Sequence, residues 1–139
     1  MGLDLPGALW AGTPWADLSK TGDSLFTNEG VDRSLVTYDG LLEGAAKLYA
    51  GGQDLKTPLI SPVYGHFEGF PPTSLVTGTR DLFLSDTARV HRKLRVAGVA
   101  ADLNVYEAVS HAEYASMLGS PESEQVYGEL GEFLRRHLE

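Results

Sequence analysis

The spacing of apolar and polar positions in the first part of the chain predicts one buried strand, one loop and one helix. The apolar run at 8–11 (ALWA) ends at residues 12–14 (GTP), so it predicts a short buried strand. Residues 15–30 (WADLSKTGDSLFTNEG) are rich in turn formers and predict a loop. In residues 34–50 apolar side chains recur at helical spacing and two glycines follow directly, which is typical of an amphipathic helix with a left-handed cap.

The second part of the chain predicts a strand, a helix, another strand and a final helix. Residues 53–72 hold four of the seven prolines and predict an irregular connection. We expect strands at 74–77 (SLVT) and 103–106 (LNVY), a helix between them at 85–97, and a last helix from about Pro121. Strand, helix and strand in succession form a βαβ unit, whose right-handed crossover makes the two strands parallel. The predicted fold class is therefore α/β, with a short, mostly parallel sheet flanked by helices.

Composition and charge narrow the classes of function. The 139 residues carry a formal net charge of −8 with no basic run, which argues against nucleic acid or an anionic membrane surface as a partner. There is no cysteine, so disulfides, thiolate nucleophiles and cysteine-bound zinc are excluded. No stretch approaches the roughly eighteen apolar residues of a membrane span, and no basic segment precedes an apolar one at the N-terminus. We therefore expect a soluble, cytoplasmic domain that acts on a small ligand.

Two residues that can carry chemistry follow the two predicted strands of the βαβ unit. Asp81 lies on the loop after 74–77, and His111 lies on the loop after 103–106, in the segment EAVSHAEY. Alone, each has an ordinary interpretation, as a turn or capping acid and as a loop histidine. Ligands of parallel sheets bind outside the carboxyl ends of the strands, where these two loops lie side by side. The joint placement therefore favours an Asp–His hydrogen bond, in which the carboxylate fixes the imidazole tautomer and stabilises the imidazolium.

The other acids and histidines of the second part have plainer interpretations. Asp86 is expected to be a favourable charge at a helix N-terminus rather than a catalytic partner. His91 and His137 are expected at solvated or helix-dipole positions, and His66 has no assigned role. The four histidines show no metal-binding spacing, and the chain has no glycine-rich phosphate loop or dinucleotide fingerprint. We therefore predict no metal and no cofactor.

Four stretches make the sequence recognisable: LPGALWAGTPWADLS, SPVYGHFEGFPP, LVTGTRDLFLSDTARVHRKLRVAGV and SHAEY. In this order they resemble the C-terminal half of the hormone-sensitive-lipase-like esterases, a branch of the α/β-hydrolase superfamily. The resemblance covers nearly the whole chain, including the spacing of thirty residues between the acid and the histidine. It implies a carboxylic ester hydrolase of the serine esterase or lipase type, in which Asp81 is the acid of the triad and His111 is the general base.

The same resemblance suggests how the chain is organised. It implies that residues 1–139 form a single, partial α/β-hydrolase domain, in which residues near 18–50 are part of a cap over the substrate. Trp15 and Asp17, in the TPWADL stretch, look structural rather than catalytic.

The motifs that complete such a site do not occur in the sequence. The family is expected to carry a serine in a G-x-S-x-G elbow and an HGGG-type oxyanion loop, both N-terminal to the matching part, and neither is present in the 139 residues. None of the serines that we considered stands in such an elbow: Ser24, Ser61, Ser74 and Ser110. Because nucleophile, base and oxyanion donors act as a unit, we expect the chain alone to be inactive or nearly so.

The absent motifs leave two questions about partners open. The strand near 8–12 would lack the neighbour that carries the nucleophile, and an unpaired apolar edge invites pairing with another chain. We expect either a homo-oligomer or pairing with an N-terminal half, and a small acyl ester as the substrate once the site is completed. The alternative is a non-catalytic assembly or binding module that derives from an esterase.

Overall fold

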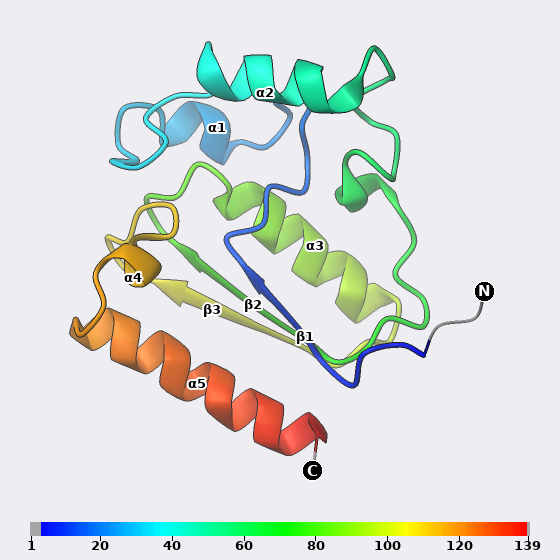
Figure 1. Cartoon of the computed structure of the whole chain (residues 1–139), viewed down its shortest axis with the longest axis vertical. Coiled ribbons are helices and arrows are strands. Elements are labelled where there is room, and N and C mark those ends of the chain that lie inside the picture. Colours follow the sequence, from blue (N-terminus) through cyan, green and yellow to red (C-terminus); the bar gives the residue numbers. More distant parts are fainter. Residues whose placement is uncertain (1–3, 139) are drawn as a thin grey trace.

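A computed structural model of the chain describes residues 4–138 and contains a three-stranded parallel sheet (Figure 1). The strands are β1 (Leu9–Gly12), β2 (Thr73–Gly78) and β3 (Ala101–Tyr106), and they lie in the order β1-β2-β3. Thr73 of β2 aligns with Leu9 on one side and with Ala101 on the other. All three strands therefore end at the same edge of the sheet, and the predicted α/β fold with a parallel sheet is confirmed.

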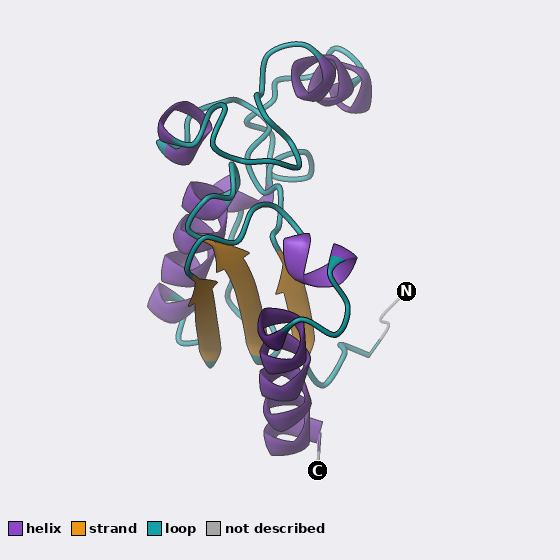
Figure 2. Cartoon of the chain, turned by 90° about the vertical axis from the view of Figure 1, so that its left-hand side faces the viewer, coloured by secondary structure: helices purple, strands orange, loops and turns teal. Residues whose placement is uncertain are grey.

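Helices cover both faces of the sheet (Figure 2). Helix α3 (Leu84–Val96) packs on β2 and β3 from one side, and α5 (Pro121–Leu138) packs on β2 from the other. The short helix α4 (Glu113–Ser116) lies near the end of β3. Within residues 4–138, none of the helices combines the length and the apolar character needed to cross a membrane.

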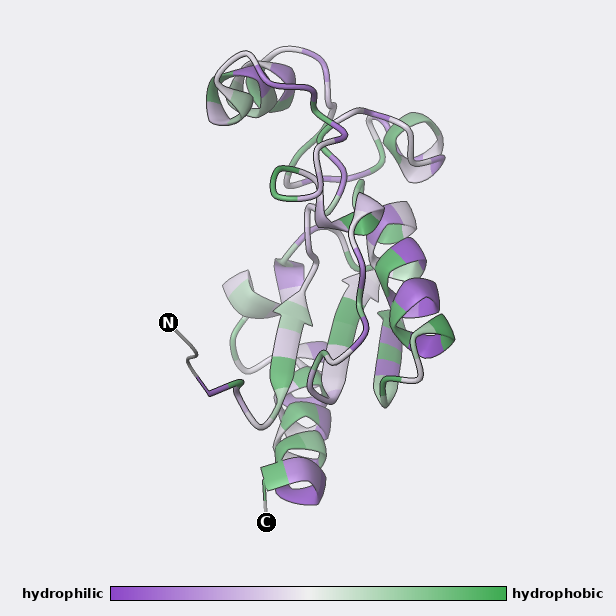
Figure 3. Ribbon diagram, turned by 90° about the vertical axis from the view of Figure 1, so that its right-hand side faces the viewer, coloured by the Kyte–Doolittle hydropathy of each residue, from purple (hydrophilic) through white to green (hydrophobic). Residues whose placement is uncertain are grey.

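The core is built around β2, whose six residues are all buried. Successive side chains of a strand point to opposite faces, so Leu75 joins the cluster with Val90 and Leu94 of α3, whereas Val76 joins Val126 of α5. Helix α3 bears hydrophobic residues toward the sheet and hydrophilic residues away from it (Figure 3). Because both faces are covered, β2 reads as an uninterrupted buried run rather than as an alternating one.

Three short elements lie beyond the carboxyl ends of the strands: α1 (Ser24–Thr27), α2 (Leu41–Ala50) and the 3₁₀ turn η1 (Pro62–Tyr64) (Figure 1). The expectation that residues 15–30 are entirely loop was wrong, because α1 lies within them. Ser24 and Ser85 fasten α1 to α3 through two reciprocal hydrogen bonds, each from a backbone N–H to the other's hydroxyl (2.9 Å).

The helix predicted at 34–50 forms only from Leu41 onward. The backbone is in the positive-φ region at Val36 (φ 64°) and Gly40 (φ 97°), which a continuous right-handed helix does not allow. Much of the predicted apolar face is also exposed, namely Leu41, Leu48 and Tyr49. Helix α3 begins at Leu84, one residue before the predicted start at residue 85.

Candidate active site

Asp81 is fully buried on the loop that leaves β2. The loop turns tightly, since the backbone N–H of Asp81 donates to the carbonyl of Gly78 (3.1 Å). The Thr77 hydroxyl donates to Asp81 Oδ2 (2.9 Å), and the Phe83 N–H donates to Oδ1 (2.8 Å). Each carboxylate oxygen thus has a donor, which offsets the cost of burying the charge and fixes the orientation of the group.

The structure brings His111 to this carboxylate. His111 lies between β3 and α4, and its Nδ1 is 3.2 Å from Asp81 Oδ1. The side chain is 22% exposed, so it lies at the boundary between the core and the surface. The loop that presents it is tightly curved, with Ala108 (φ 63°) and Ala112 (φ 52°) both in the left-handed region. The ring is therefore presented by a constrained backbone rather than by an open loop.

The loops that carry Asp81 and His111 are joined to each other directly. Arg80 donates its backbone N–H to the carbonyl of Val109 (3.2 Å), and Ala108 donates to the hydroxyl of Thr79 (2.9 Å). Gly78 makes this approach possible, because a Cβ there would overlap the Val109 carbonyl. Two hydrogen bonds therefore join the segments that directly precede Asp81 and His111.

The segment before α2 is attached to the Asp81 loop through side chains that the sequence did not single out. Asn28 donates its side-chain amide to the carbonyls of Thr79 (3.1 Å) and Asp81 (2.9 Å). Buried Asp32 accepts the N–H of Leu82 through Oδ2 (2.9 Å). The only signal for these residues was their turn-forming type, which does not reveal a partner fifty positions away.

The four serines considered above have structural roles. The hydroxyls of Ser24, Ser61 and Ser110 hydrogen-bond to backbone groups, and Ser74 is buried within β2. Ser110 is fully buried although it adjoins His111 in sequence. These contacts agree with the reading that none of them stands in a nucleophile elbow.

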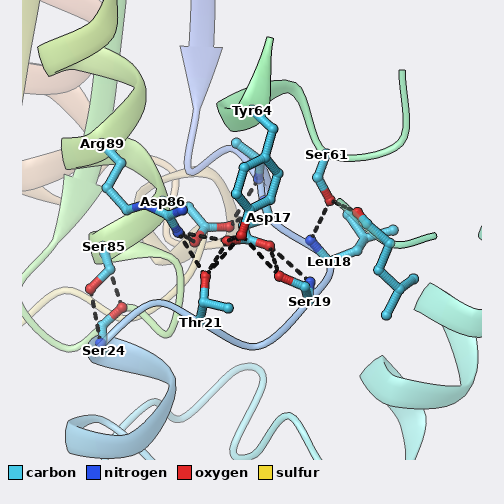
Figure 4. A network of polar contacts seen from close by, with 12 residues as sticks. Asp17, Leu18, Ser19, Thr21, Ser24, Ser61, Tyr64, Ser85, Asp86 and Arg89 are labelled. Atoms are coloured by element: carbon cyan, nitrogen blue, oxygen red, sulfur yellow. Dashed lines mark hydrogen bonds and ion pairs between the residues drawn. The ribbon is translucent and has the colours of Figure 1, made fainter. Parts of the chain in front are cut away.

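A second acidic group, Asp86, differs from expectation (Figure 4). Asp86 lies in the first turn of α3, but its Oδ2 accepts the backbone N–H groups of Ala16 (3.0 Å) and Asp17 (2.8 Å). It therefore holds the loop after β1 and does not act as a solvated helix-end charge. Within residues 4–138 its Oδ1 has no hydrogen-bond partner. Burial raises the pKa of Asp86 to about 7, and the charge of Asp17 adds to this shift against the effect of the two N–H donors.

Asp17 is the centre of a buried network in the same region (Figure 4). Its carboxylate accepts hydrogen bonds from Ser19 (2.5 Å), Thr21 (2.5 Å), Tyr64 (2.8 Å) and Arg89 (2.6 Å). Burial tends to raise the pKa of Asp17, but the donors Ser19, Thr21 and Arg89 outweigh burial and hold the pKa well below its usual range. Asp17 therefore stays ionised and joins the β1 loop to η1 and α3.

The remaining histidines lie away from the Asp81 carboxylate. His66 is exposed, 3.9 Å from a Glu68 oxygen. His137 packs on the ring of Phe133, with 4.5 Å between the ring centroids. His91 is half-buried and its Nε2 lies 3.2 Å from the carbonyl of Ala101, so the expectation of a solvated position was wrong for this residue.

The parallel sheet, with an acid and a histidine in contact on the loops after neighbouring strands, defines an α/β protein of the hydrolase type. Residues 3–115 match the protein family described as alpha/beta hydrolase fold, and the chain belongs to this family. Two structural relatives are a crystal structure of an esterase, E25 (61% identity, TM-score 0.95), and one of an esterase from the bacterial hormone-sensitive lipase family (33% identity, TM-score 0.91). The resemblance to the hormone-sensitive-lipase-like esterases is thereby confirmed.

The match covers most of this chain but only part of each relative. Esterase E25 aligns with 97% of this chain and 41% of its own, and the hormone-sensitive-lipase-family esterase with 99% and 46%. Among curated proteins, an acetyl-hydrolase of Streptomyces hygroscopicus is 29% identical over 96% of this chain and 44% of its own length. An esterase of Acinetobacter venetianus is 26% identical over 93% and 42%. The chain thus spans less than half the length of these relatives.

Proposed function

We propose that Asp81 and His111 are the acid and the general base of a serine-dependent hydrolysis of carboxylic esters. The observation that carries the proposal is the 3.2 Å contact between Asp81 Oδ1 and His111 Nδ1, with the carboxylate fully buried. The names of the relatives, esterase and acetyl-hydrolase, support the reaction class.

The contact with Asp81 supports a separate task for each ring nitrogen of His111. A proton on Nδ1 is held by Asp81, which leaves Nε2 as the basic nitrogen. Nε2 makes no hydrogen bond to any residue from 4 to 138. It would take the proton of a serine hydroxyl as the serine attacks the ester, and return it to the departing alcohol. In the second half of the reaction it would activate a water that hydrolyses the acyl-enzyme, while the Asp81 charge stabilises the imidazolium.

In this proposal the nucleophile comes from outside these 139 residues and lies on a strand that pairs with β1. Within residues 4–138, β1 pairs with β2 only. Leu9 and Thr13 donate their N–H groups toward β2 (2.8 Å each), so the backbone groups of Trp10 and Gly12 face the open side. We propose that a strand carrying the serine pairs there, and that the isolated chain is a very poor esterase.

We further propose that the described residues act as one domain with a cap-like part near 18–50. Elements α1 and α2 lie beyond the carboxyl ends of the strands (Figure 1), and Asp81 and His111 lie on the loops that follow β2 and β3. An apolar hollow of about 400 Å³ is formed by residues of α2, η1 and the loops near them, namely Trp15, Leu18, Ala45, Tyr49, Leu59, Ile60 and Pro62. Its lining is suited to the apolar part of a small acyl ester. The cytoplasmic location expected from the sequence stays a prediction.

Complementation tests the proposed function. The chain is co-expressed with the N-terminal half of an esterase relative that contains the G-x-S-x-G segment, and hydrolysis of p-nitrophenyl butyrate is measured. We expect turnover from the mixture, almost none from either part alone, and loss of turnover with His111→Ala. His66→Ala is the matched control, because His66 is exposed and away from the carboxylate. If the two parts co-elute as a complex without turnover, the proposal fails and a non-catalytic assembly module is favoured.

A further inference from the structure

Phe83 contacts both members of the proposed acid and base pair. It is buried at the N-terminal end of α3, and its backbone N–H donates to Asp81 Oδ1 (2.8 Å). Its ring lies against the ring of His111, with 5.0 Å between centroids and an angle of 80° between the planes. This is the edge-to-face arrangement that aromatic rings prefer. One residue therefore fixes the acid through its backbone and the base through its side chain.

The ring of Phe83 is in turn held from its other side. Trp15 stacks on it with 5.2 Å between centroids and 10° between planes. The indole N–H of Trp15 donates to the carbonyl of Asp17 (3.1 Å), and the N–H of Asp17 donates to the buried carboxylate of Asp86 (2.8 Å). The stack is thus attached to α3 and to the Asp17 network, so its position does not depend on surface side chains.

We propose that Phe83 is a positioning residue for His111, and that Trp15 supports it by stacking. The inference rests on the proposed function, since it describes how the base of that site is oriented. In the part of the chain that the structure describes, the His111 ring makes one hydrogen bond, through Nδ1, and it is partly exposed. Rotation about its side-chain bonds would carry Nδ1 away from Asp81. The ring of Phe83 blocks that rotation by packing.

NMR of the whole chain with ¹⁵N-labelled histidine tests the inference without any turnover. In the unmodified chain we expect a low-field Nδ1 proton on His111, the Nδ1–H tautomer, and a nuclear Overhauser effect between the two rings. Phe83→Leu keeps the backbone N–H but removes the aromatic edge. We expect about fivefold faster solvent exchange of the Nδ1 proton and a mixed tautomer. Phe83→Tyr should restore the original exchange rate.

The matched control is Phe70→Leu, because Phe70 is a partly exposed phenylalanine that packs on Phe67 and not on His111. Unchanged exchange in a folded Phe83→Leu chain, or no ring-to-ring Overhauser effect in the unmodified chain, would overturn the inference. If Phe83→Leu does not fold, Trp15→Phe decides, since a smaller stacking partner should give exchange faster than in the unmodified chain. A lack of turnover in the complementation assay would reject the proposed function, whereas these NMR results would reject the inference about Phe83. The two failures can therefore be told apart.

Discussion

Arg80 and Val109 are joined by a backbone hydrogen bond of 3.2 Å, although they lie twenty-nine positions apart in the sequence. The bond ties the loop after β2 to the loop after β3, so the contact between Asp81 and His111 is supported by the backbone as well as by the side chains. The relative position of Asp81 and His111 therefore depends on how these two loops are joined, and it should change when a substitution separates the loops.

Gly78→Ala should separate them. A methyl group at this position would overlap the Val109 carbonyl, and both loops would have to shift. We expect a loss of about 1–3 kcal/mol in the free energy of unfolding, measured by urea titration. Gly44→Ala is the matched control, because Gly44 lies in α2 with open space around it and alanine favours helix. Equal effects of the two substitutions would contradict the close approach.

The buried carboxyl of Asp86 should make stability depend on pH. Its pKa is raised to about 7 in the folded chain, above its ordinary value, because burial disfavours the charge. The folded state then holds a proton that the unfolded state releases. The resulting contribution of Asp86 to the free energy of unfolding is therefore complete below about pH 4 and is lost as the pH rises toward 7. Asp17 and Arg89 face the same carboxyl and are charged throughout this range.

Asp86→Asn removes the titration while keeping an oxygen that can accept the N–H groups of Ala16 and Asp17. We expect the stability of this variant relative to the unmodified chain to improve by on the order of 1–3 kcal/mol between pH 4 and pH 7. Urea titrations at several pH values measure the difference. Asp23→Asn, a change at an exposed acid, should show no such trend. A difference that is flat with pH would refute the prediction.

Arg89→Met should weaken the network around Asp17. The substitution keeps the aliphatic stem but removes the cation that lies 2.6 Å from the buried carboxylate. Because Arg89 is about one-third exposed, we expect a loss of roughly 1–3 kcal/mol near neutral pH, less than for a fully buried pair. The pKa of Asp17 is lowered in the folded chain, so this stabilisation is present at neutral pH and is lost as the pH falls.

The matched control for Arg89→Met is Arg92→Met, an exposed arginine in the same helix. Its effect on the free energy of unfolding should stay within about 0.5 kcal/mol. The prediction is wrong if both variants lose the same stability, or if the effect of Arg89→Met grows as the solution is acidified.

The order of the elements and the meeting of Asp81 with His111 followed from local patterns in the sequence. Parallel strands end at one edge, so residues just after consecutive strands lie close together whatever the intervening helix contains. The hydrogen bonds of Asp86 to the loop after β1 could not be predicted, since an acid at a helix end and an acid that contacts Ala16 look alike in the sequence. Only the fold shows that seventy residues are bridged.

The part of the chain beyond the strand ends was harder to predict for a related reason. Residues 34–40 have helical spacing of apolar side chains, yet Val36 and Gly40 take positive φ because tertiary contacts override a weak local preference. The contacts of Phe83 could not be predicted from the sequence either. A phenylalanine four positions before Thr87 looks like an ordinary core residue of the helix, whereas its contacts with Asp81 and His111 depend on where two other segments lie.

The open side of β1 should make the chain self-associate when no other strand covers it. Within residues 4–138, the backbone groups of Trp10 and Gly12 on this side have no partner strand, and β1 is short, apolar and only half-buried. Light scattering at micromolar concentration should therefore show an oligomer. Leu9→Lys places a charge at this edge, which is a common way in which proteins prevent such pairing. We expect the apparent association to weaken about tenfold while the fold is kept.

Leu59→Lys is the matched control, because it makes the same chemical change at a leucine that is 90% exposed beside the apolar hollow. Association through β1 predicts that Leu9→Lys weakens the oligomer and Leu59→Lys does not. The reverse result would place the contact on the surface formed by α2 and Leu59, whose neighbours Leu48 and Tyr49 are also exposed. If the unmodified chain is a monomer at these concentrations, the open edge alone does not drive association. Strand pairing would then also need a partner with a matching apolar face.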